Sequence, residues 1–148
     1  MVISMLKRII DFFRYNGEKW MTISVYIYAA YYRMCILFVP MPKLEKRMGI
    51  RGEESPENET PENIKLAKLV RFHVNRVTGH TPWESKCLVQ ALTARRILKK
   101  KNINTTLYLG VMKENNEMKA HAWLRCGELY VTGGDGSSFG MVAKFKAF

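Results

Sequence analysis

The sequence has few cysteines, and their spacing excludes the sites that cysteines usually build. Cys35, Cys87 and Cys126 are the only three in 148 residues, and none forms a CxxC or CxxH pair. An odd number without such spacing predicts neither a disulfide framework nor a zinc knuckle. We therefore expect free thiols in a reducing compartment, with no metal and no other cofactor.

The start of the chain also lacks the pattern of a secretion signal. Lys7 and Arg8 are followed closely by Asp11 and Arg14, which interrupt any apolar region, and no small-residue cleavage site follows. Export is not expected, and a cytoplasmic location is predicted. The length of 148 residues and the 47% of hydrophobic residues are ordinary for one folded domain, which excludes wholesale disorder.

Acidic residues are scarce and unevenly placed. The sequence has thirteen Asp and Glu and 24 Lys and Arg, which gives a formal net charge of +11. Five of the glutamates lie within residues 53–63. Such a chain attracts nucleic acid, lipid headgroups or an acidic peptide, and composition does not choose among them. No nucleic-acid-binding motif is present, so nucleic acid is not an expected partner. The basic cluster at residues 95–101 is typical of the solvated C-terminal end of a helix.

One segment, residues 21–39, has the composition of a helix that meets a membrane. It is mostly apolar or aromatic, with Arg33 as its only charge. An unpaired Arg inside a span is costly, and the segment only just reaches the length a span needs. Its apolar residues at three- and four-residue spacing favour a helix packed on the core. A true span and a helix lying on a membrane surface are the alternatives, so membrane contact through residues 21–39 stays open.

Helices are expected in the first part of the chain and strands in the second. Residues 49–61 have the composition of a solvated loop, and Thr60 with Pro61 begins a helix that extends to about residue 77. His73 lies beside the apolar stripe of that helix and is expected to be structural. Thr81 starts a capping box before the helix that carries Cys87, on whose packed side Cys87 is expected to lie. Gln90, Arg95, Arg96 and Lys99 are expected to lie away from that side.

Two or three antiparallel strands should follow, because residues 105–112, 120–126 and 129–132 have strand composition or alternation. This order predicts an α+β fold. We expect a helical region over residues 1–50, without strands up to residue 60, then an acidic linker or loop over residues 51–62. The core should span residues 63–148.

Cys87, His121 and Asp135 form the combination that could perform catalysis. A helix N-terminus and a nearby imidazolium both favour the thiolate of a cysteine, and a histidine can carry its proton. A carboxylate behind the histidine would fix the tautomer of the ring. Buried cysteines and strand histidines are also common structural residues, and the glycine-rich setting of Asp135 equally suits a tight turn. Cys35 and Cys126 have no nearby base in the sequence and are expected to be structural.

Four segments resemble the lasso-peptide leader peptidases, and the similarity spans residues 67–139. The segments are WESKCLVQAL at residues 83–92, RRIL at 95–98, LGV at 109–111 and AHAWL at 120–124. The resemblance implies a transglutaminase-like, papain-related cysteine protease core with an N-terminal helical extension. It also implies that Cys87 is the nucleophile and His121 the base of an enzyme that removes the leader from a ribosomally made precursor peptide.

The partners implied by this resemblance are the precursor peptide and a macrolactam synthetase that closes the ring. Some members of the family carry an N-terminal winged-helix domain that holds the leader. Residues 1–60 are not expected to form one, so a separate leader-recognition protein is expected. The third catalytic residue of the family usually lies about a dozen positions after the histidine, where this chain has Thr132, Gly133 and Gly134. Asp135 would have to act from slightly further along the chain.

Two other functions remain open from the sequence. One is a non-catalytic basic adaptor that binds a peptide, a membrane or nucleic acid. The other keeps the fold and changes the reaction to that of a transglutaminase-like amide transferase, since the same cysteine and histidine serve acyl transfer to an amine or to water.

Overall fold

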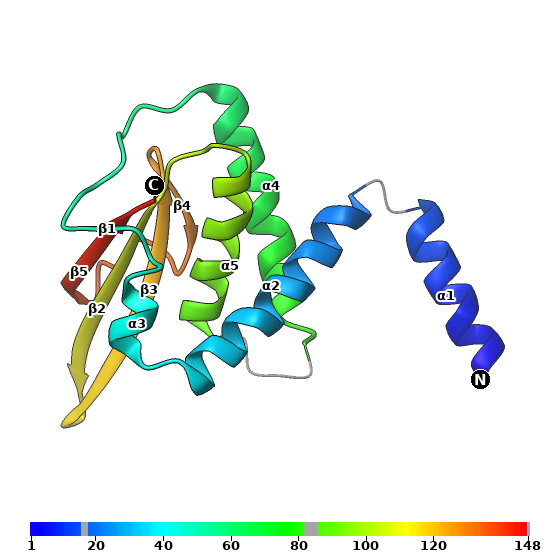
Figure 1. Ribbon diagram of the computed structural model, residues 1–148, viewed down its shortest axis with the longest axis horizontal. Coiled ribbons are helices and arrows are strands. Elements are labelled where there is room, and N and C mark those ends of the chain that lie inside the picture. The colour runs from blue at the N-terminus through cyan, green and yellow to red at the C-terminus, as the bar shows by residue number, and fades with distance from the viewer. Residues whose placement is uncertain (16–17, 82–85, 148) are drawn as a thin grey trace.

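The computed structural model describes residues 1–15, 18–81 and 86–147. Its helices are α1 (Val2–Tyr15), α2 (Lys19–Phe38), α3 (Met41–Glu45), α4 (Pro61–Thr78) and α5 (Cys87–Lys100). Its strands are β1 (Ile50–Arg51), β2 (Thr106–Glu114), β3 (Glu117–Cys126), β4 (Leu129–Thr132) and β5 (Gly140–Lys146). The predicted α+β fold is therefore confirmed (Figure 1).

The strands form one antiparallel sheet in the order β1-β5-β2-β3-β4. β2 and β3 are joined by Asn115 and Asn116, which both have positive φ (51° and 63°). This is the backbone that a two-residue hairpin turn with the twist of its strands requires. β5 lies between β1 and β2 in the sheet and was not predicted from the sequence; Ala143 and Phe145, two residues apart on this strand, are buried.

α2, α4 and α5 pack in a layer in which α5 contacts the sheet and α2 covers α4 and α5 (Figure 1). α4 begins as the sequence predicts, because Thr60 Oγ1 accepts a hydrogen bond from the Asn63 N–H at 3.2 Å and Pro61 is the first helical residue. α5 begins at Cys87, and the capping box expected from Thr81 involves residues 82–85, which lie outside the described residues. The core between the layers is aliphatic; its fully buried members include Val25, Val70, Leu92, Leu98, Leu107 and Leu124.

One face of α2 belongs to the core of the protein. Val25, Ala29 and Tyr32, which the sequence placed on one stripe, are buried together with Thr22 and Cys35. Among the described residues, α2 is the one helix long and apolar enough to cross a membrane, yet this face packs against α4 and α5. The interpretation as a packed helix is confirmed for that face.

Arg95 is buried, which the sequence did not predict. Arg95 was expected on the side of α5 that faces away from the core. α2 covers this side, so Arg95 is only 2% exposed. Burial lowers the pKa of Arg95, and the nearby Tyr32 opposes this shift. The basic cluster at residues 95–101 is therefore not wholly solvated.

The acidic segment is a loop, as expected, but it is fixed to the sheet. Two of its features differ from the expected solvated linker, since β1 pairs with β5 and Ser55 is buried. Arg125, only 6% exposed, donates from Nη2 to the Ser55 carbonyl oxygen at 2.8 Å and from Nη1 to the Gly127 carbonyl oxygen at 2.6 Å. Its Nε donates to the Tyr108 hydroxyl at 3.0 Å. β1 is too short for an alternating pattern, so its pairing is visible only in the folded chain.

His73 is buried and hydrogen-bonded, which fits the structural role expected from the sequence. It is 2% exposed, and its Nε2 lies 2.5 Å from Glu18 Oε2. Its Nδ1 lies 3.1 Å from Arg76 Nη2, which also donates to Thr22 Oγ1 at 2.7 Å. These contacts join the start of α2 to α4 and occupy both ring nitrogens of His73.

Candidate active site

Cys87 occupies the first position of α5. The preceding residue, Lys86, has an extended backbone (φ −77°, ψ −178°), so the helix begins at the cysteine itself. The side chain of Cys87 is half-buried and packs against the core, which is the side the sequence predicted. Backbone N–H groups in the first turn have no acceptor within the helix. The Cys87 N–H is consequently a candidate donor to an oxyanion.

His121 lies on β3 with its ring packed against two aromatic rings. It pairs across the hairpin with Gly110 of β2, and its ring stacks on Phe139 with centroids 4.6 Å apart and on Trp123 at 6.0 Å. Its Nε2 lies 2.7 Å from the Gly133 carbonyl oxygen. A carbonyl oxygen only accepts hydrogen bonds, so Nε2 carries the proton and, in the neutral ring, Nδ1 is the basic nitrogen.

Glycines make room for the aromatic residues around His121. A Cβ on Gly110 would lie 2.7 Å from the Trp123 ring, and a Cβ on Gly136 would overlap that ring. Gly133 has φ of +75°, and a Cβ there would overlap the Ala122 carbonyl oxygen. The glycines therefore allow the close approach that brings the Gly133 carbonyl to His121.

Sequence reasoning did not identify Phe139 or the Gly133 carbonyl as neighbours of His121. The signal was present in part, because Gly133 lies twelve residues after His121, where the leader peptidases that the sequence resembles usually have their third catalytic residue. A backbone carbonyl leaves no side-chain signature in a sequence. It could not be assigned before the fold was known.

Asp135 lies in a turn. Its side chain is exposed, and its Oδ1 accepts a hydrogen bond from the Ser137 N–H at 3.0 Å. This hydrogen bond lowers the pKa of Asp135. The turn interpretation of the sequence fits these contacts, and Asp135→Ala separates it from the catalytic role that the sequence also predicts.

The elements that carry Cys87 and His121 are in contact, since α5 packs against β3. His121 and Trp123 project from one face of β3, while Ala122 and Leu124 on the other face belong to the core against which Cys87 packs. Within the described part of the chain, no hydrogen bond joins the thiol to the imidazole. Direct contact between the Cys87 thiol and the His121 imidazole therefore stays a prediction.

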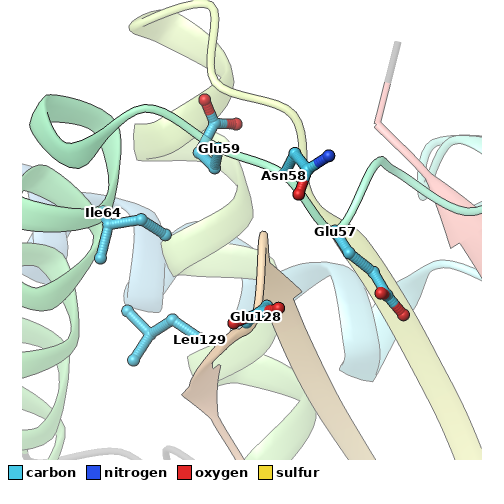
Figure 2. Close-up of a pocket in the computed structure, with 6 residues that line it drawn as sticks. All are labelled: Glu57, Asn58, Glu59, Ile64, Glu128 and Leu129. Carbon is cyan, nitrogen blue, oxygen red and sulfur yellow. The ribbon is translucent and has the colours of Figure 1, made fainter.

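A separate pocket of about 410 Å³ lies between the acidic loop and the turn after β3 (Figure 2). Its lining residues are Glu57, Asn58, Glu59, Ile64, Glu128 and Leu129. The Glu57 and Glu59 carboxylates point away from each other (Figure 2). Among the described residues, no group of three or more His, Cys, Asp or Glu is arranged to hold a metal ion. This pocket includes neither Cys87 nor His121, so it is distinct from the candidate active site.

Alkylation should distinguish the three cysteines. Cys126 is fully buried, and burial, with a smaller effect of the Glu59 carboxylate, raises the pKa of its thiol to about 11. Only about one Cys126 thiol in a thousand is then ionised at pH 8, and Cys35 is also buried. We expect iodoacetamide at pH 8 to modify Cys87 first in the folded protein, and Cys35 and Cys126 only in denaturant, as measured by mass spectrometry of tryptic peptides. Modification of Cys126 as fast as Cys87 would contradict this expectation.

Comparison with protein families gives one match. Residues 39–145 match the family described as the transglutaminase-like superfamily, a range that contains both Cys87 and His121. Neither curated proteins nor solved structures give a significant match.

Proposed function

Because this chain belongs to the transglutaminase-like superfamily, we propose that it is a cysteine peptidase that removes the leader from a ribosomally synthesised lasso-peptide precursor. The observation that carries the proposal is the placement of two residues within the matched range: Cys87 at the start of α5, and His121 on β3 with its Nε2 bonded to the Gly133 carbonyl oxygen. The resemblance of the WESKCLVQAL and AHAWL segments to leader peptidases supports the substrate class.

The proposed chemistry requires the Cys87 thiol and the His121 imidazole to come together when substrate binds. Nδ1 of neutral His121 takes the proton of the Cys87 thiol, and the thiolate attacks the scissile carbonyl carbon to form a tetrahedral intermediate. The Cys87 N–H donates to the oxyanion. Collapse of the intermediate transfers the His121 proton to the leaving amine, which becomes the N-terminus of the core peptide, and leaves the leader as a thioester on Cys87. His121 then deprotonates a water molecule, which attacks the thioester and releases the leader with a new carboxylate.

The proposed partners follow from this reaction. A separate protein holds the leader and presents the precursor, and a macrolactam synthetase consumes the new α-amine to close the ring. The experiment is mass spectrometry of a precursor peptide incubated with the purified chain and the leader-binding protein, with Cys87→Ala as the control. A single leader cut made by the wild type and lost in the control supports the proposal, and a cut that survives Cys87→Ala removes the nucleophile.

The same experiment separates a peptidase from an amide transferase. A small primary amine is added in excess, and the C-terminus of the released leader is measured by its mass. A peptidase gives mainly the carboxylate, because water attacks the thioester, whereas a transferase gives mainly the amide of the added amine. An adaptor without catalysis gives neither product with any precursor.

Asp135→Ala is expected to retain most of the cleavage activity. The Asp135 carboxylate is exposed and bonded to the Ser137 N–H, whereas His121 is oriented by the Gly133 carbonyl. The measurement is kcat/KM for leader cleavage, with His121→Ala as the reference for complete loss. A decrease as large as that of His121→Ala would instead assign Asp135 as the third catalytic residue.

A further inference from the structure

α1 exposes apolar side chains to solvent. Its apolar residues up to Ile10 are all exposed, the least of them Ile9 at 48%; they are Val2, Ile3, Met5, Leu6, Ile9 and Ile10. The helix stands apart from the layer formed by α2, α4 and α5 (Figure 1). Exposed apolar surface gathered on one element indicates an interaction site, because leaving it in water is unfavourable.

The apolar residues of α1 are confined to one side of the helix. At 100° per residue they occupy a sector of about 160°, and Ser4, Lys7, Arg8 and Asp11 occupy the remaining side. The polar side carries two cations beside a single carboxylate in this span, in a chain whose net charge is +11. A helix with a wide apolar side and basic residues on the other is typical of segments that lie flat in a membrane interface.

We propose that α1 binds the surface of a membrane containing anionic lipids, with its apolar side among the acyl chains near the headgroups. Lys7 and Arg8 then lie at the level of the lipid phosphates, where each cation strengthens binding. Trp20, at the start of α2, is 69% exposed and has the side chain that most often lies in the headgroup region.

The shape of the apolar side favours a lipid surface over a second copy of this chain. Two paired helices cover a narrow seam of positions at 3.5-residue spacing, which is much narrower than the sector of α1. Pairing two copies would also bring two basic helices together. A lipid surface covers the whole sector and supplies the opposite charge.

This proposal places the membrane contact on α1 rather than on a span formed by α2. The face of α2 that includes Val25 and Ala29 is buried against α4 and α5, and a crossing would remove it from the core. α1 has no such role in the core, so it can bind lipid while the fold of the remaining chain is kept.

The test is flotation of the full chain with vesicles of phosphatidylcholine alone or with one quarter phosphatidylglycerol. We expect flotation with the anionic vesicles and little with the neutral ones. Leu6→Glu should weaken binding by roughly 10- to 100-fold, because a charge replaces a residue on the apolar side. Ser4→Glu is the matched control, since it adds the same charge at another exposed position of α1 but on the polar side, and it should weaken binding far less.

Both substitutions lie at exposed positions of a helix that stands apart from the core, so both variants should show the wild-type unfolding temperature. The proposal is overturned if the wild type does not float with anionic vesicles, or if the two variants lose binding equally. It is also overturned if the wild type is a dimer that Leu6→Glu dissociates without any vesicle binding. That result would assign the apolar side to a second copy of this chain.

Discussion

Cys87→Ala and His121→Ala are each expected to lower kcat/KM for leader cleavage by at least about 10³-fold. Without the sulfur no thioester forms, and without the imidazole the thiol keeps its proton and the leaving amine receives none. Because the two groups act as one unit, the double variant should lose little more than either single variant. The measurement is the initial rate of leader release by mass spectrometry.

A matched control for the cysteine is available in the same chain. Cys126 is fully buried with a pKa raised to about 11, so Cys126→Ala removes a thiol that takes no part in the reaction. Its activity should stay within about threefold of the wild type, after correction for the folded fraction, because the substitution leaves only a small cavity. Cleavage that is retained by Cys87→Ala and lost by Cys126→Ala would reverse the assignment.

Arg125→Leu is expected to lower the free energy of unfolding by about 3–5 kcal/mol. The guanidinium donates to the carbonyl oxygens of Ser55 and Gly127 and to the Tyr108 hydroxyl. These acceptors would lose their donor inside the protein, and each such loss costs about 1–3 kcal/mol. The loop that contains Ser55 would also lose its attachment to the sheet, which adds to the loss in free energy of unfolding.

Arg51→Leu makes the same chemical change at an exposed position and serves as the control. Arg51 pairs with Glu45 at 3.0 Å with 61% of its side chain exposed, so its loss should cost less than about 1 kcal/mol. Arg125→Lys keeps the charge but not the geometry of the guanidinium, and an intermediate loss is expected. The measurement is urea denaturation followed by circular dichroism. A loss below about 1 kcal/mol for Arg125→Leu would mean that water replaces the guanidinium at these acceptors.

The sequence by itself determined the features that depend on neighbouring residues. Thr60 and Pro61 identify the start of α4; alternation identifies β3, and the turn at Gly127 and Glu128 identifies β4, within a few residues of their bounds. The position of Cys87 near a helix start was also predicted, because the apolar spacing of α5 is a local pattern. The fold class followed from the order of helices and strands and was correct.

Only the tertiary structure decided what depends on contacts between distant residues. Arg95 is buried because α2 covers α5, and Ser55 is buried because Arg125, 70 residues later, donates to its carbonyl. The group next to His121 Nε2 is a backbone carbonyl, which every residue possesses and no sequence pattern distinguishes. Hydrophobic spacing specifies which side of a helix or strand is buried. Which element packs against that side depends on contacts between residues that are far apart in the sequence.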